Sequence, residues 1–158
     1  MTKELELCMF PDPILRAQAD SVVHVGEHER HLMKAMLESM WQWNGVGLAA
    51  PQVGFSSRII VLEAEGEKRA LANPIILESE GADTMEEGCL SLPGQVVNIS
   101  RASSIWIQAL DIQNRQVELK LDGFLARIVQ HEIDHLNGKL IIDYGATKPH
   151  QAGRWNEL

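Results

Sequence analysis

The residues best suited to chemistry stand together late in the chain, in the run His131-Glu132-Ile133-Asp134-His135. On a helix, residues four apart share one face, so both imidazoles can reach one metal ion while Glu132 lies beside them. Two histidines and an acid at this spacing indicate a metal-dependent hydrolase that still needs a third protein ligand. The alternative is an amphipathic helix whose His and Glu side chains are solvated by chance, and this spacing makes that the weaker interpretation.

The sequence around this run has the marks of a single helix. Asp122 can cap its start, and the stretch from Phe124 to Leu136 contains no proline or glycine. Asn137 and Gly138 then provide a left-handed stop. A helix is therefore expected to carry both histidines.

The third ligand must come from elsewhere in the chain. Ile141 occupies the position where an extended metzincin pattern requires its third histidine. A thermolysin-like site would need a downstream Glu, and only Glu157 follows, one residue from the chain end. Cys89 is the better candidate, because a thiolate is a strong ligand and an intervening hairpin can return it to the helix. A buried, inert thiol is the commoner fate of a lone cysteine, so the residues alone leave both roles open.

The remaining elements predict an α+β fold with antiparallel sheet. Apolar residues repeat at helical spacing from about Glu27 to Asn44, with Gly45 as the terminator, and Asp12-Pro13 begins a short helix. A turn at 65–67 joins two of the expected strands into a hairpin. The expected strands are 58–62, 69–73, 104–110 and 116–121, with a further extended piece at 74–78. The small-residue run 45–54 is interpreted as a loop that permits close approach of backbone. Strands without intervening helices favour α+β over α/β.

Composition sets further bounds. The 158 residues are expected to form one domain, 1–158, and the net charge of −8 argues against a general nucleic-acid binder. No apolar run reaches the length of a membrane span, so no membrane association is expected. The N-terminus lacks a signal-peptide core, which predicts a cytoplasmic protein. Two cysteines, Cys8 and Cys89, form no disulfide framework.

Three stretches together resemble the signature motifs of peptide deformylases, in the order and at the spacing of that family. They are Gly45-Val-Gly-Leu-Ala-Ala-Pro-Gln52, Glu87-Gly-Cys-Leu-Ser-Leu-Pro93 and Gln130-His-Glu-Ile-Asp-His-Leu136. Phe10-Pro-Asp-Pro-Ile-Leu-Arg16 is also similar to the family's N-terminal segment. The resemblance extends from about residue 10 to 144.

This resemblance implies antiparallel β-sheets around a central helix that carries the His-Glu-x-x-His motif, with an N-terminal helix. It implies Cys89, His131 and His135 as the ligands of one divalent metal ion, with Glu132 as general acid/base. The family removes the formyl group from the N-formylmethionine of newly made chains. Its usual metal is Fe(II), and Zn(II), Ni(II) or Co(II) can replace it; a Cys/His/His set suits both iron and zinc.

The resemblance also assigns the substrate contacts. Gln52 and the backbone N–H of Leu90 are implied to stabilise the oxyanion. The implied lining of the methionine pocket is Val46, Phe124 and Ile128, and the implied backbone contacts to the peptide are at Val46, Gly47 and Gly88. Ordinary core packing is an equally weighted interpretation of Phe124. An ion pair between Arg101 and Asp134 is expected to anchor the segment after the cysteine motif to the metal helix.

The chain departs from the family pattern at three places. Val96 stands where many relatives carry Arg or an aromatic residue, which puts contacts to outer peptide residues in doubt. Arg127 replaces an apolar residue found in many bacterial members. Lys148 and Arg154 are the only cations after Tyr144, whereas relatives that dock on the ribosome use a longer basic helix, so ribosome docking through that element is not expected.

Two other functions remain open from the sequence. A metallopeptidase would share the histidine pair, but the third-ligand patterns of the common peptidases are missing. An inactive relative would bind peptide N-termini or metal without catalysis, which the intact Gln52, Cys89 and Glu132 argue against.

Overall fold

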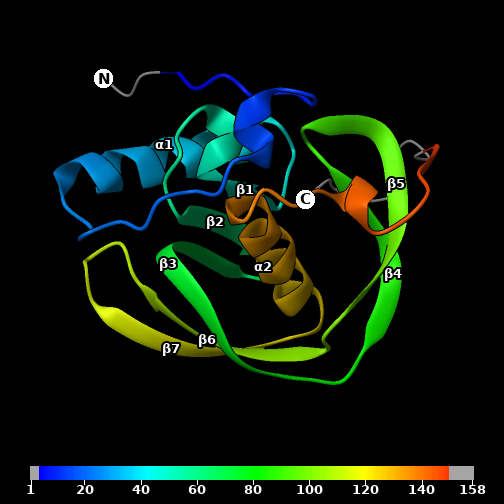
Figure 1. Ribbon diagram of the computed structural model, residues 1–158. Coiled ribbons are helices and arrows are strands. Elements are labelled where there is room, and N and C mark those ends of the chain that lie inside the picture. Colours follow the sequence, from blue (N-terminus) through cyan, green and yellow to red (C-terminus); the bar gives the residue numbers. More distant parts are fainter. Residues whose placement is uncertain (1–3, 150–158) are drawn as a thin grey trace.

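The computed structural model describes residues 4–149 (Figure 1). Two α-helices and eight strands are defined within this range. The helices are α1 (Glu27–Gln42) and α2 (Gly123–Leu136). The strands are β1 (Gly47–Ala49), β2 (Ile59–Ala64), β3 (Glu67–Glu80), β4 (Asp83–Cys89), β5 (Leu92–Arg101), β6 (Ser104–Leu110), β7 (Gln116–Asp122) and β8 (Lys148–Pro149). Short 3-10 helices span Pro13–Arg16, Ala50–Val53 and Ile141–Asp143.

The strands form two antiparallel sheets, and α2 lies between them (Figure 1). The larger sheet has the order β1-β2-β3-β6-β7, and the smaller has the order β4-β5-β8. This confirms the predicted α+β class with antiparallel sheet around the helix that carries the histidines. Among residues 4–149, no helix is long and apolar enough to cross a membrane.

Alternation along β2 shows how the larger sheet separates the two helices. Ile60 and Leu62 belong to the core cluster that contains the buried residues of α2, whereas Ile59 and Val61 belong to the cluster of α1. Successive side chains of a strand point to opposite faces, so α1 and α2 pack on opposite faces of this sheet. Among residues 4–149, β1 pairs with β2 alone, so it forms an edge of the sheet on which α2 packs.

The predicted helices are confirmed, with corrections at their ends. The earlier helix ends at Gln42, and Asn44, with φ of 59°, takes the left-handed conformation that was expected of Gly45. Asp122 is the N-cap residue of α2, but its side chain makes no capping hydrogen bond. Its carboxylate instead accepts a hydrogen bond from the Ser104 hydroxyl, which ties β7 to β6.

The predicted strands are also present, and several are longer than expected. The turn between β2 and β3 consists of Glu65 and Gly66, both with positive φ, which suits the twist of a two-residue hairpin. Strand β3 includes the extended piece at 74–78 as well as the return strand. The run 45–54, expected to be a loop, contains β1 and a 3-10 helix. Strands β4 and β5 were not anticipated; in β5, Pro93 and Gly94 obscure the alternation.

The C-terminal end of α2 is fixed by contacts from distant parts of the chain. The Arg58 guanidinium donates to the Leu136 carbonyl at 3.0 Å. Gly138 has φ of +72°, and a Cβ there would come within 2.4 Å of the Arg16 carbonyl oxygen. The glycine is therefore required both for the left-handed backbone and for the close approach of the N-terminal segment. Arg154 and Glu157 lie outside the described residues.

This close approach predicts a measurable difference between two glycines with positive φ. Gly138→Ala should lower the free energy of unfolding by the left-handed penalty of about 1–2 kcal/mol plus an overpacking term of about 1–3 kcal/mol. Gly54→Ala, at φ of +90° with nothing within 4 Å of the added Cβ, should cost only the left-handed penalty. Urea unfolding of both variants tests this, and equal losses would contradict the steric explanation.

Candidate metal centre

The structure brings Cys89, His131 and His135 together in the interior. Cys89 is the last residue of β4, and the two histidines lie one turn apart on α2. Their ligand atoms all lie within 4.8 Å of one another, and all three residues are buried. The His135 Nε2 atom is 3.4 Å from Cys89 Sγ and 3.2 Å from His131 Nε2.

The two separations from His135 Nε2, to Cys89 Sγ and to His131 Nε2, fit a tetrahedral metal ion. Bond lengths of about 2.3 Å to sulfur and 2.0 Å to nitrogen put neighbouring ligand atoms roughly 3.3–3.6 Å apart. Burial lowers the pKa of His135 well below its ordinary value, which keeps the imidazole neutral and its lone pair available. One thiolate and two imidazoles leave a fourth position for water or substrate, as catalytic rather than structural sites do.

Glu87 orients the first histidine. Its Oε1 atom is 2.9 Å from His131 Nδ1. Burial by itself would raise the pKa of Glu87, but hydrogen bonds from Arg101 and His131 outweigh it and hold the pKa well below its ordinary value. An ionised carboxylate can only accept, so Nδ1 carries the hydrogen and donates it. The Nε2 atom of His131 is thereby turned to the side of Cys89 and His135.

Two arginines complete the hydrogen bonding of Glu87. Arg101 donates from Nε to Oε2 at 2.9 Å and from Nη2 to Oε1 at 2.8 Å. Arg127 donates from Nη1 to Oε2 at 2.6 Å. Arg101 Nη1 also meets Asp134 Oδ2 at 2.7 Å, which confirms the predicted ion pair. Tyr144 donates its hydroxyl to the same Asp134 oxygen, so the carboxylate of α2 has two partners.

The departures from the family pattern have defined places in the structure. Arg127 is 2% exposed and belongs to the buried cluster around Glu87. Val96 is buried in β5, where it pairs with Lys148 of β8. Lys148 in turn lies 3.3 Å from the carboxylate of Glu86.

Glu132 has the opposite environment from Glu87. Both of its carboxylate oxygens are buried without a hydrogen-bond partner among the described residues. Burial raises the pKa of Glu132 to about 7, so near neutrality this carboxyl can both accept and return a proton. A Cβ on Gly47 would lie 2.5 Å from Glu132 Oε2 and 2.7 Å from Ile128 Cγ2. The glycine of β1 therefore makes room for this carboxylate.

Gln52 is held with its amide nitrogen toward the cysteine. Its Oε1 atom accepts from the Ala49 N–H at 3.0 Å, which fixes the orientation of the amide. Its Nε2 atom then donates to Ser91 Oγ at 3.1 Å and lies 3.7 Å from Cys89 Sγ. The side chain is fully buried, so this donor is positioned beside the cysteine before any substrate arrives.

The other expected site residues lie in three places. Gly88 and Leu90 are the neighbours of Cys89 in the chain, and Leu90 follows the end of β4 in the turn to β5. Val46 precedes the edge strand β1, and Gly47 is its first residue. Ile128 is fully buried in α2, and the half-buried Phe124 packs against the same core cluster. Phe124 thus has a packing role in the core.

Sequence reasoning missed three polar residues of this site. Glu87 was recognised only as part of a motif, although it lies two residues before Cys89, the candidate third ligand. Ser91 and Tyr144 gave no comparable signal. Their roles depend on where β5 and the segment after α2 return, which local spacing does not specify.

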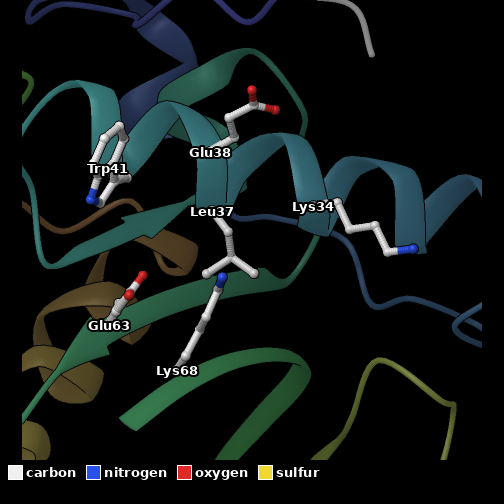
Figure 2. Close-up of a pocket in the computed structure, with 6 residues that line it drawn as sticks. All are labelled: Lys34, Leu37, Glu38, Trp41, Glu63 and Lys68. Carbon is white, nitrogen blue, oxygen red and sulfur yellow. The ribbon is translucent and has the colours of Figure 1, made fainter. Parts of the chain in front are cut away.

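A separate hollow of about 400 Å³ lies between α1 and the β2–β3 hairpin. Figure 2 shows its lining, which is Lys34, Leu37, Glu38 and Trp41 of α1 with Glu63 and Lys68 of the hairpin. Neither Glu132 nor any of the three metal-ligand candidates lines this hollow.

An α+β domain with a buried Cys/His/His cluster and an adjacent unpaired carboxylate defines a metal-dependent hydrolase. Comparison with known proteins gives the family. The sequence pattern of the family described as Polypeptide deformylase matches residues 4–151. Peptide deformylase of Halothermothrix orenii is 49% identical over 142 residues, which are 88% of this chain and 92% of the relative. That of Dictyoglomus turgidum is 48% identical over 139 residues, which are 88% and 91%.

Solved structures agree with this match. The peptide deformylase of Thermotoga maritima superimposes with a TM-score of 0.88 at 41% identity, over 91% of this chain and 99% of that one. The peptide deformylase of Synechococcus elongatus, solved in complex with actinonin, superimposes with a TM-score of 0.86 at 36% identity. The match covers 92% of this chain and 84% of that one. The chain therefore belongs to the polypeptide deformylase family. Members of this family are metal-dependent hydrolases that remove the formyl group from an N-terminal methionine, and this chain is one of them.

The buried charge cluster makes a prediction about stability. Arg101→Met should lower the free energy of unfolding by about 3–5 kcal/mol, because Glu87 and Asp134 would lose a buried partner. The control is Arg115→Met, which removes an exposed pair with Asp111 and should cost less than about 0.5 kcal/mol. Denaturant unfolding measures both, and a small loss for Arg101→Met would contradict the structural role of the cluster.

Proposed function

We propose that the chain deformylates N-formylmethionyl peptides with Cys89, His131 and His135 holding one divalent metal ion and Glu132 moving the proton. One observation carries this proposal. Three ligand atoms of suitable type lie within 4.8 Å of one another, next to a buried carboxylate whose oxygens have no partner among the described residues. A carboxylate left unpaired in the interior is costly, and groups perturbed in this way cluster at functional sites.

The residues of the chain account for the steps of the hydrolysis. A bound divalent ion would supply Lewis acidity, which polarises the formyl carbonyl and makes water more acidic. Glu132 takes a proton from the attacking water and later delivers it to the amine nitrogen as the formyl C–N bond breaks. The products are formate and a free N-terminal amine. The Gln52 amide and the Leu90 backbone N–H donate to the carbonyl oxygen as it gains negative charge, and one such donor contributes about 3 kcal/mol.

The peptide would bind as an added strand along β1. Within the described part of the chain this strand has a partner only on its β2 side, and Gly88 lies on β4 next to the cysteine. Backbone groups of Val46, Gly47 and Gly88 would then hydrogen-bond the peptide with little demand on its sequence. Ile128 and Phe124, together with Val46, would line the space for the methionine side chain. A formyl carbon carries only hydrogen, so a narrow approach to Glu132 would exclude bulkier acyl groups.

The choice of metal and cellular partners extends this proposal. We infer Fe(II) as the native ion from the resemblance to the family. A thiolate with two imidazoles also suits Zn(II), Ni(II) and Co(II), so these ions could replace it. Nascent N-formylmethionyl polypeptides are the proposed substrates, which makes the cytoplasm the proposed compartment. Contact with the ribosome is compatible with this substrate, whereas no direct contact with nucleic acid is proposed for a chain of net charge −8.

The first test of the proposal is the proton-transfer role of Glu132. Glu132→Gln should reduce formate release from formyl-Met-Ala-Ser by roughly 10²–10⁴-fold, because the amide cannot accept the proton of water. Its metal content should equal that of the wild type, and Glu118→Gln on the exposed side of β7 should keep full activity. No formate from fully metallated wild type would defeat the proposal. Cleavage of unformylated Met-Ala-Ser would instead indicate a peptidase.

The second test uses the two cysteines as a matched pair. Cys89→Ser should leave the protein with far less than one metal ion per chain, because a serine hydroxyl is a weak ligand beside a thiolate. Cys8→Ser should retain the wild-type metal content, since Cys8 is partly exposed and lies outside the cluster of ligand candidates. Elemental analysis after purification measures both. Equal metal content in the two variants would rule out the thiolate as a ligand.

A further inference from the structure

Arg127 makes more contacts in the interior than a packing role requires. Its Nη1 atom donates to Glu87 Oε2 at 2.6 Å and to the Ile99 carbonyl at 2.9 Å. Its Nη2 atom donates to the Asp83 carbonyl at 2.6 Å. The side chain is 2% exposed, so the guanidinium is almost fully removed from water. A buried arginine with this many directed hydrogen bonds fixes the groups that it contacts.

The position of Arg127 on α2 explains which groups these are. It lies four residues before His131, so both side chains project from the same face of the helix. Arg127 reaches Oε2 of Glu87 while His131 reaches Oε1 of the same carboxylate. The plane of this carboxylate therefore depends on Arg127 and His131 as well as on the two hydrogen bonds from Arg101, and the ring of His131 depends on the carboxylate.

The two backbone contacts connect α2 to the strands of the smaller sheet. Asp83 begins β4, the strand that ends at Cys89, and Ile99 lies in β5, which pairs with β4. One guanidinium thus holds the helix that carries both histidines against the strand pair that carries the cysteine. Without it, the described contacts between these elements around Glu87 would come from Arg101 and His131.

We propose that Arg127 is a positioning residue for the metal site, which sets the ring of His131 through Glu87 and holds the strand pair of Cys89 against α2. The proposal rests on the ligand set of the proposed function. It predicts that loss of the guanidinium weakens metal binding itself, before any substrate is present.

The experiment titrates Co(II) into metal-free protein and follows the visible absorption of the cobalt and its thiolate charge-transfer band. Arg127→Met should weaken Co(II) binding by roughly 10- to 100-fold, as removal of groups that orient metal ligands commonly does, and should shift the cobalt spectrum. Arg127→Lys keeps a positive charge beside Glu87 but cannot donate to the Asp83 and Ile99 carbonyls at the same time. Its affinity for Co(II) should therefore lie between those of the wild type and Arg127→Met. If Arg127→Met does not fold, Arg127→Lys decides: weakened binding supports the proposal and wild-type binding overturns it.

The matched control is Arg58→Met. Arg58 anchors the other end of α2 through the Leu136 carbonyl at 3.0 Å and Asn137 Oδ1 at 2.9 Å, and it has no contact with Glu87. This variant should bind Co(II) with the wild-type affinity and spectrum even if it unfolds more easily. The proposal is overturned by folded Arg127→Met with wild-type binding and spectrum, or by an equal loss of affinity in Arg58→Met. Wild-type protein that shows no thiolate–cobalt band would instead overturn the ligand set itself.

Discussion

The hydrogen bond from His131 to the buried carboxylate of Glu87 is the interaction on which the rest of the site depends. A carboxylate in the interior is stable only when its oxygens accept enough donors. Glu87 accepts four, one from His131, two from Arg101 and one from Arg127. This set keeps Glu87 ionised, and an ionised Glu87 in turn decides which nitrogen of His131 faces the other ligands.

This constraint explains why the site needs two sheets and a helix. Glu87 is on β4, Arg101 ends β5, and His131 and Arg127 are on α2, so the donors come from three elements. The pairing of β4 with β5 brings Arg101 across from Asp83, and α2 then closes the cluster from its other side. Cys89 is on the same strand as Glu87, and the contacts that satisfy the acid therefore also place the thiol.

Local spacing predicted the parts of the site that a single element supplies. The histidines four apart required only that 124–136 be helical, and the alternation at 104–110 and 116–121 identified two strands from their own residues. The role of Glu87 and the existence of the strand pair β4–β5 were missed, because each depends on partners that only the folded chain brings close. The Arg101–Asp134 pair was anticipated through resemblance to the family, since nothing local joins residues 33 positions apart.

Glu87 and Glu132 show how the fold gives one residue type two functions. Both are fully buried, yet the pKa of Glu87 is held well below its ordinary value by its donors while burial raises that of Glu132 to about 7. The difference in pKa comes from the neighbours of the two carboxylates. Arginines surround Glu87, whereas Gly47 provides Glu132 with space but no hydrogen-bond donor. Two acids whose environments push their pKa values apart can hold a fixed charge and move a proton in the same core. Gly47 and Arg127 thus act on different carboxylates: the glycine leaves room for Glu132, whose oxygens have no partner among the described residues, and the arginine donates a hydrogen bond to Glu87.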